Sequence, residues 1–271
     1  MKRLIIAGFG DVARRALPLL PFEIFKLARR DGFDLDRPET LRLPPAAALL
    51  HLAPPPPQGD RDTRTANLIA ALEKGRILPA RMVYVSTSGV YGDCAGERVD
   101  ESRAPAPGTA RARRRLDAER QLARWCDMHD IPLVILRAPG IYAADRLPLE
   151  RLRAGRPVAR AEDDIYTNHI HADDLARIVA RALEDDAPPG TYNAADDSEL
   201  LMADWLDLVA DFAGLSRPPR VPREQLVDPF TTESRRLLNR KMKEQLRVDL
   251  HYPTVHHALR NEHATRPKQP A

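Results

Sequence analysis

Residues 4–13 read LIIAGFGDVA: a short apolar run, two glycines separated by one residue, and the start of a helical pattern. A continuously apolar run of this length is typical of a parallel strand covered on both faces. Gly8, Gly10 and Ala13 have the spacing of a dinucleotide-binding turn. There Gly8 permits the tight turn, Gly10 lets a pyrophosphate approach the backbone, and Ala13 keeps the helix close to the sheet. The helix that begins at Asp11 would offer unpaired N–H groups to the phosphates.

Apolar runs and helical patterns alternate over the first 140 residues. We expect strands at residues 22–28, 47–53, 81–86 and 133–136, and helices at residues 11–20, 60–74 and 113–129. This alternation predicts an α/β protein with a Rossmann-type, doubly wound parallel sheet. Between residues 28 and 49 only Leu41-Arg42-Leu43-Pro44 could supply a further strand. Without it the sheet would be abbreviated on that side.

The second half of the chain is more mixed and predicts a small substrate lobe. We expect a dinucleotide-binding domain at residues 1–145, with its sheet completed by about residues 171–195. Residues 146–170 and 196–260 are the expected segments of a mixed C-terminal lobe, and residues 261–271 a flexible tail. Helices are expected at residues 173–183 and 200–212. The second has an apolar stripe that is most simply a core face, formed by Leu201, Trp205, Leu208, Val209 and Phe212.

Composition narrows the class of protein. The net charge is +3 over 271 residues, and no apolar run approaches the roughly 18 residues of a membrane span. Cys94 and Cys126 are the only cysteines and form neither a disulfide framework nor a zinc spacing. We therefore expect a cytoplasmic protein with no membrane partner. His169 and His171 lack a third ligand nearby, so no metal site is expected.

Two arginines at the end of the second strand bear on the choice of cofactor. An NAD site would place a carboxylate about 20 residues after the glycine turn, on the ribose hydroxyls. Arg29 and Arg30 stand near that place, and a guanidinium there suits a 2′-phosphate. NADP is therefore the expected cofactor. Asp31 keeps NAD open if the strand ends later.

Several further segments together resemble the extended short-chain dehydrogenase/reductase family, in its NAD-dependent epimerase/dehydratase group. The resemblance covers almost the whole chain. Its motifs are the apolar strand ending in His-x-Ala, the "SS-x-x-VYGD" signature, the "LR-x-x-x-(V/I)Y" segment, the "IHVDDLA" segment and the "G-x-YN" strand. They correspond to residues 50–53, 83–93, 136–142, 168–176 and 190–193. The resemblance implies that Ala53 and Pro139 lie beside the cofactor, with Gly8, Gly10, Asp11 and Ala13.

The resemblance also locates the chemistry. Family members use a Ser or Thr, a Tyr and a Lys, and Thr87 takes the first position. The segment from Pro107 to Leu116 matches "P-x-(S/T)-x-Y-x-x-x-K", with Glu119 downstream supporting the register. This sets Arg111 on the Tyr and Arg115 on the Lys.

Arg115 could still hold a ribose hydroxyl or a phosphate. Arg111 could stabilise an oxyanion but cannot act as a general acid, because its pKa exceeds 12. A proton would then come from Tyr91, Tyr142, His169 or His171, each of which could equally be structural.

Two classes of function follow. The first is an NAD(P)-binding oxidoreductase or epimerase/dehydratase-like enzyme that acts on a small, sugar-like substrate by a non-standard mechanism, with Thr87, Arg111 and Tyr91 as catalytic candidates. The second is a non-catalytic NADP-binding sensor or regulatory protein. Nucleic-acid binding would rest only on the arginine run at residues 111–115 and is not expected. The sequence leaves a homodimer open.

Overall fold

A six-stranded parallel sheet forms the centre of the computed structural model, which describes residues 1–226 and 233–265. The strand order is β11-β6-β4-β3-β1-β2. All five neighbouring pairs are parallel. The strands are β1 (Arg3–Ala7), β2 (Glu23–Leu27), β3 (Ala48–His51), β4 (Arg81–Thr87), β6 (Leu133–Ala138) and β11 (Gly190–Asn193). The predicted Rossmann-type sheet is confirmed.

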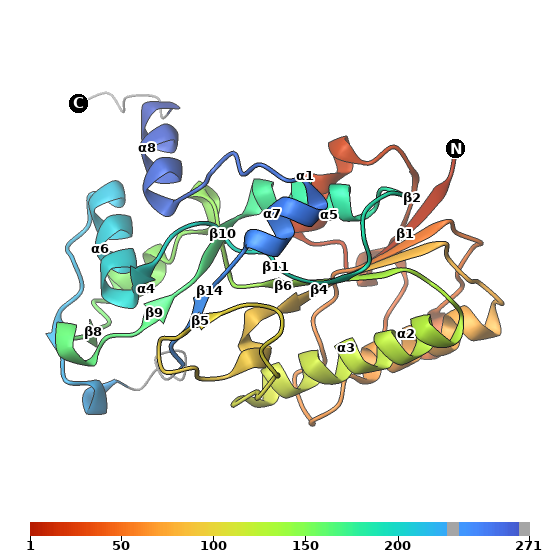
Figure 1. The fold of residues 1–271 in the computed structure, drawn as a ribbon, viewed down its shortest axis with the longest axis horizontal. Helices are drawn as coiled ribbons and strands as arrows, with labels where there is room; N and C mark the ends of the chain where they lie inside the picture. Colours follow the sequence, from red (N-terminus) through yellow and green to blue (C-terminus); the bar gives the residue numbers. More distant parts are fainter. Residues whose placement is uncertain (227–232, 266–271) are drawn as a thin grey trace.

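Helices cover both faces of this sheet (Figure 1). On one face lie α1 (Asp11–Ala16), α5 (Ala172–Ala182) and α7 (Arg240–Leu246), and on the other lie α2 (Thr63–Lys74) and α3 (Ala110–Met128). Successive side chains of a strand point to opposite faces. Accordingly Leu4 and Ile6 join the core under α1 and α5, while Ile5 and Ala7 join the core under α2 and α3. From Leu4 to Ala7 the strand is apolar at every position because these residues contribute to both cores.

The connection between β2 and β3 contains no strand. Residues 41–44, which could have supplied a further strand, pair with no strand, and β2 is the edge of the sheet. Two 3₁₀ turns occupy the connection instead, at Arg29–Asp31 and Pro38–Thr40. Pro44 and Pro45 lack the N–H groups that a sheet strand needs. The sheet is therefore abbreviated on this side.

Three helix boundaries differ by three residues or more from those expected. Helix α2 begins at Thr63 rather than residue 60, because the Asp62 carboxylate caps it by accepting from the Arg64 and Thr65 N–H groups. Helix α1 ends at Ala16 rather than residue 20 and continues as a 3₁₀ turn at Leu17–Leu19. Pro18 cannot donate the hydrogen bond that would continue an α-helix. Helix α3 begins at Ala110 rather than residue 113, because the Thr109 hydroxyl caps it by accepting from the Ala112 N–H at 3.2 Å.

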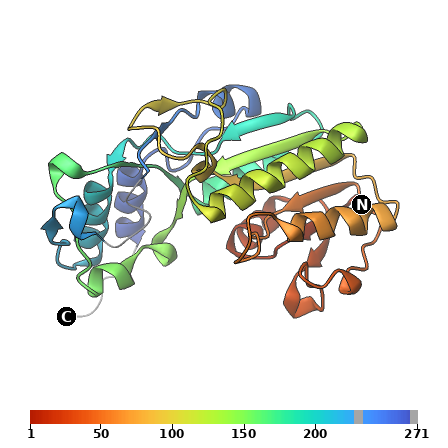
Figure 2. The ribbon, with the colours of Figure 1, turned by 90° about the horizontal axis from the view of Figure 1, so that it is seen from below.

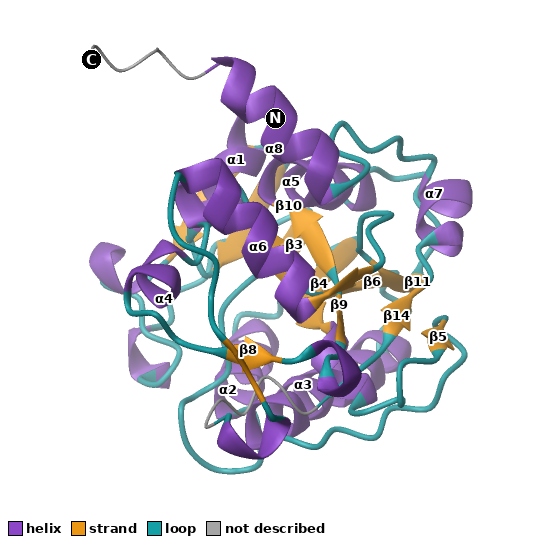
Figure 3. Ribbon diagram, turned by 90° about the vertical axis from the view of Figure 1, so that its left-hand side faces the viewer, coloured by secondary structure: helices purple, strands orange, loops and turns teal. Residues whose placement is uncertain are grey.

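The lobe packs at the end of the sheet where β4 and β6 finish (Figures 2 and 3). It contains α4 (Leu149–Arg153), α6 (Met202–Ala213) and α8 (Val255–Thr265) around a core of its own. Trp205, Val209 and Phe212 of the predicted apolar stripe lie in that core. Short strand pairs complete the lobe and its junction with the sheet: β7 (Gly140–Tyr142) with β10 (His169–His171), β8 (Val158–Ala159) with β13 (Arg220–Val221), β9 (Tyr166–Thr167) with β12 (Leu200–Leu201), and β5 (Arg98–Val99) with β14 (Arg236–Leu237).

The lobe is not assembled from the expected segments alone. Within residues 196–260, helix α7 packs on the sheet, because Met242, Leu246 and Val248 belong to the core under α1 and α5. The expected tail at 261–271 overlaps α8, which runs to Thr265, and residues 266–271 lie outside the described part of the chain. No helix within the described ranges has both the length and the apolar character to cross a membrane.

Candidate functional site

The glycine turn after β1 lies at the carboxyl end of the sheet and forms one wall of a cavity. Gly8 has φ +90°, and a Cβ there would stand 2.4 Å from the Ala53 backbone nitrogen. Only glycine adopts that backbone and permits that approach without strain. A Cβ on Gly10, in contrast, would meet no atom within 4 Å. Ala13 is fully buried against the sheet.

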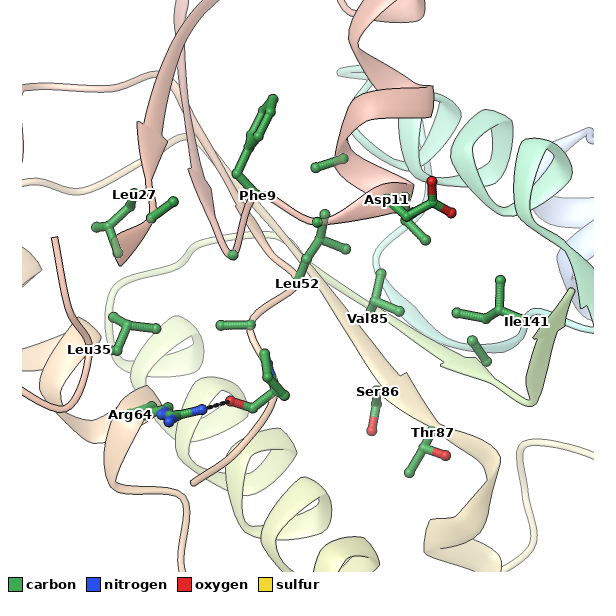
Figure 4. A pocket seen from close by; sticks show the side chains of 18 of the residues that line it. Phe9, Asp11, Leu27, Leu35, Leu52, Arg64, Val85, Ser86, Thr87 and Ile141 are labelled. Carbon is green, nitrogen blue, oxygen red and sulfur yellow. Dashed lines mark hydrogen bonds between the residues drawn. The ribbon is translucent and has the colours of Figure 1, made fainter. Parts of the chain in front are cut away.

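This first cavity, cavity 1, has a volume of about 420 Å³. Figure 4 shows side chains from the glycine turn, the ends of β2, β3 and β4, and Ile141 of β7 surrounding it. It is lined by every expected cofactor-binding residue except Arg30: Gly8, Gly10, Asp11, Ala13, Arg29, Ala53, Arg115 and Pro139. The carboxyl ends of parallel strands are where open α/β sheets bind ligands. The fold therefore gathers residues that lie more than 130 positions apart in the sequence.

The two arginines after β2 are placed differently. Arg29 lines cavity 1 and is exposed. Arg30 instead lies over the ring of Phe9, 5.2 Å from its centroid, and Lys26 lies 4.7 Å from the same ring. Asp31 is 3.8 Å from Arg30 and does not line the cavity. Of this group, Arg29 alone can reach a ligand in cavity 1 directly.

Residues that the sequence did not reveal close the same end of cavity 1. Phe33, Asp34 and Leu35 line it because the short connection folds back over the ends of the strands. Arg64 at the start of α2 also lines it, and its guanidinium is held by Asp36 at 2.6 Å and by the Pro54 carbonyl at 3.0 Å. No local motif marks these positions, because the connection has no regular pairing.

Arg115 is buried in the wall of cavity 1, with 8% of its surface exposed. Its Nη1 donates to the Ala53 carbonyl at 3.2 Å, the Tyr84 hydroxyl at 3.1 Å and the Val85 carbonyl at 3.1 Å. These oxygens satisfy one end of the guanidinium without neutralising it. Burial together with the charge of Arg115 lowers the pKa of His51 to about 3, so His51 is neutral. Arg115 thus holds a fixed positive charge beside the cavity.

A buried ion pair fixes the position of α3 against the sheet. Glu119 of α3 binds Arg137 of β6 through two bonds of 2.7 and 3.2 Å, with side chains 5% and 7% exposed. The Ser86 hydroxyl donates to the same carboxylate at 2.5 Å. Because Arg111 and Arg115 lie on the turns of α3 before Glu119, this pair determines where both arginines stand.

A second cavity of about 540 Å³, cavity 2, lies between the sheet and the lobe. The lobe contributes Tyr166, Trp205 and Met202, and the segment after residue 232 contributes Glu233 and Arg235. The two cavities share five lining residues, namely Thr87, Arg111, Pro139, Ile141 and Arg146. Thr87 and Arg111 therefore stand where the two cavities meet.

The four candidate proton donors separate into two groups. Tyr142 and His169 line cavity 2. Tyr91 and His171 line neither cavity. The Tyr91 side chain is 1% exposed, and its hydroxyl donates to the Asn193 amide oxygen at 2.8 Å. His171 caps α5 by accepting from the Asp173 N–H. These contacts give Tyr91 and His171 structural roles.

Tyr142 and His169 belong to a buried polar and aromatic cluster. Their ring centroids are 6.0 Å apart, and His169 packs on Trp205 at 4.4 Å. Burial lowers the pKa of His169 to about 3, which keeps it neutral. Burial raises the pKa of Asp196 to about 7, against the lowering effect of hydrogen bonding by Ser198 and then Tyr142. Asp196 can therefore exchange a proton near neutral pH.

Residues 63–195 match the sequence model of the NAD dependent epimerase/dehydratase family. The fold and the glycine turn agree with this match. The chain thus resembles the NAD-dependent epimerase/dehydratase family over residues 63–195, just under half of its length. About half of this chain, 49% of its residues, also aligns with human dTDP-D-glucose 4,6-dehydratase, at 24% identity over 141 residues. This chain spans about 40% of the length of the curated relatives it matches.

Solved structures with a similar fold align over nearly the whole chain. A functionally unknown conserved protein from Silicibacter pomeroyi is 28% identical, with a TM-score of 0.77 over 97% of this chain and 99% of that one. RMD from Pseudomonas aeruginosa, complexed with NADPH, is 19% identical, with a TM-score of 0.75 over 96% and 97%. UDP-N-acetylglucosamine 4-epimerase from Bacillus cereus is 17% identical, with a TM-score of 0.75 over 97% and 99%. The latter two resemblances concern the fold alone.

Proposed function

We propose that this chain binds a nicotinamide dinucleotide in cavity 1, NADP(H) in preference to NAD(H). It then acts on a small, sugar-like substrate in cavity 2 without the Tyr and Lys of related enzymes. One observation carries this proposal: the two cavities join at Thr87 and Arg111, so a ligand in each would meet there. Solved relatives hold NADPH or NAD, which supports a cofactor of this class.

The residues of cavity 1 suit such a cofactor. Gly10 leaves open the space that a pyrophosphate would fill. Small side chains at Ala28, Ala53 and Ala138 leave room along the strand ends. Arg29 is exposed at the end near Phe33 and could pair with a 2′-phosphate, and Arg115 could hold a ribose hydroxyl. When bound, the nicotinamide supplies the redox chemistry, and the chain positions it.

The remaining roles follow from the geometry of cavity 2. Thr87 would orient the substrate, and Arg111 would stabilise negative charge, since a guanidinium does not release its proton. The proton would pass through Tyr142, which lines cavity 2 and hydrogen-bonds Asp196. Tyr91 is less suited to this role than Tyr142, because its hydroxyl is committed to Asn193.

The experiment is a calorimetric titration of wild type and Arg29→Ala with NADPH and NADH. The wild type should bind NADPH more tightly. Loss of a charge-assisted hydrogen bond costs roughly 1.5–3 kcal/mol, so Arg29→Ala should shrink the preference about tenfold or more. Arg37→Ala is the control, because Arg37 pairs with Glu39 at 3.2 Å and does not line cavity 1. Equal affinities in the wild type would contradict the NADP preference, and no binding of either would contradict the function.

A non-catalytic NADP-binding sensor is the second candidate, favoured by Arg111 at the place of the usual proton donor. It is distinguished by turnover. Under this alternative the wild type binds NADPH but changes no nicotinamide absorbance with any carbonyl or hydroxyl substrate, and Arg111→Tyr combined with Arg115→Lys gains activity.

A further inference from the structure

We propose that the ligand of cavity 2 carries a carboxylate or phosphate group, and that Arg111 binds this group where cavity 2 meets cavity 1. The inference rests on the proposed function, since it names the class of substrate for that site. It comes from the charges that line the cavity and from the start of α3.

Within the described ranges of the chain, Arg111 is the cation of cavity 2 that has no counter-charge. Among the residues the structure describes, its guanidinium takes part in no hydrogen bond or ion pair, and its side chain is exposed. The other two cations of the cavity each pair with a carboxylate. Arg146 pairs with Asp11 at 2.9 Å, and Arg235 pairs with Glu233 at 2.9 Å. Cavity 2 therefore presents one unneutralised positive charge to whatever enters it.

The position of this charge on α3 is unfavourable without a ligand. Arg111, Arg113, Arg114 and Arg115 stand at the start of a 19-residue helix whose first turn has no acidic residue. A helix N-terminus is the positive end of the dipole and favours anions. The charge of Arg113 is balanced by Asp60, whose Oδ1 lies 3.1 Å from the Arg113 Nε. Although the Arg111 side chain keeps contact with solvent, its partial enclosure in the cavity wall, and then the charges of Arg115 and Arg114, lower its pKa. An anion bound at Arg111 would relieve the repulsion that remains.

The place of Arg111 also restricts where the substrate carries its charge. A nucleotide sugar carries its negative charge on a diphosphate, on the far side of the sugar from the reacting end. Arg111 instead borders both cavities, as Thr87 does. The anionic group would thus lie next to the part of the substrate that faces the cofactor. A short hydroxy acid, oxo acid or phosphate ester has this arrangement, and about 540 Å³ accommodates it.

The test is calorimetry and thermal unfolding with inorganic phosphate and oxalate as probes, with and without saturating NADPH. The variants are Arg111→Gln, Arg111→Lys and, as the matched control, Arg113→Gln. Arg113 is two residues further along α3, pairs with Asp60 and lines neither cavity. UDP-glucose and uncharged glycerol are titrated in parallel.

We expect the wild type to bind at least one of the two anions. Arg111→Gln should weaken binding by about tenfold or more, the factor given by loss of a charge-assisted hydrogen bond. Arg111→Lys should retain part of the affinity, and Arg113→Gln all of it. Without ligand, Arg111→Gln should melt at a higher temperature than wild type, because a repelling charge is removed.

Unchanged anion affinity in Arg111→Gln, an equal loss in Arg113→Gln, or no binding of either anion by the wild type would overturn the inference. So would tight UDP-glucose binding that does not depend on Arg111. The NADPH titration separates this failure from that of the proposed function. If NADPH binds and the anions do not, only the inference fails, whereas loss of NADPH binding removes the proposed function itself.

Discussion

Replacing Gly8 should mainly affect folding and replacing Gly10 should mainly affect cofactor binding, although the two glycines are only two residues apart. The structure gives them opposite surroundings. A Cβ on Gly8 would collide with the backbone at Ala53 and Leu52, at distances of 2.4 to 2.9 Å. A Cβ on Gly10 would enter open space in the wall of cavity 1. Gly8→Ala should therefore damage the fold, and Gly10→Val the binding site.

The magnitudes follow from these contacts. Strain from the positive φ at Gly8 costs about 1–3 kcal/mol, and overpacking costs about the same again. A loss of roughly 2–6 kcal/mol should lower Tm by about 2 °C for each kcal/mol in a chain of this size. Gly10 is the residue before the first turn of α1 and has φ −93°, which valine adopts. Gly10→Val should cost about 1 kcal/mol, the scale of a lost helix cap.

Thermal unfolding with and without NADPH measures both effects. At a concentration of one hundred times Kd, a ligand stabilises the folded state by about 2.7 kcal/mol, so the wild type should gain about 5 °C. Gly10→Val should gain nothing. Gly8→Ala should melt well below Gly10→Val in the absence of cofactor. If Gly10→Val kept its NADPH shift, or if Gly8→Ala were as stable as Gly10→Val, the account of the glycine turn would be wrong.

Two further predictions concern buried charge. Glu119→Gln leaves Arg137 buried without its charged partner and should destabilise the protein by about 3–5 kcal/mol in urea unfolding. The control is Glu73→Gln, which changes an exposed residue of α2 and should cost little. A loss below about 1 kcal/mol for Glu119→Gln would refute a structural role for the pair. Asp196 has a pKa raised by burial to about 7. The folded state therefore holds this proton between the ordinary carboxyl pKa and pH 7 while the unfolded state has lost it, so stability falls as pH rises through this window. Asp196→Asn should flatten the fall in Tm between pH 5 and pH 7, and an unchanged pH profile would show that Asp196 is already ionised in the folded protein.

Local sequence features were sufficient to predict the order of strands and helices in the sheet domain. The run at residues 4–7 is apolar at every position because β1 is covered on both faces, whereas a strand with one face in water would alternate apolar and polar residues. The glycine spacing placed the turn at the carboxyl end of that strand. The distance from Thr109 to Glu119 predicted the register of α3, and the Glu119–Arg137 contact shows the consequence of that register.

Each helix boundary that was predicted wrongly depends on a single atom or hydrogen bond. Pro18 ends α1 because it lacks an N–H, and the hydroxyl of Thr109 starts α3 three residues earlier than the periodicity indicated. Residues 41–44, which the sequence left open as a further strand, have a suitable alternation, yet they pair with no strand of the sheet. Pairing is a long-range property, which a short pattern cannot decide.

The sequence by itself determined the fold class, the glycine turn and the substitution of arginine at positions 111 and 115, because each depends on neighbours along the chain. Only the tertiary structure decided which of these residues face a cavity. Arg29 does and Arg30 does not, Tyr142 does and Tyr91 does not, although each pair matched the same expectation. The physical reason is that a side chain's exposure is fixed by segments far away in the sequence. The Asn193 amide that takes up the Tyr91 hydroxyl lies 102 residues further along the chain.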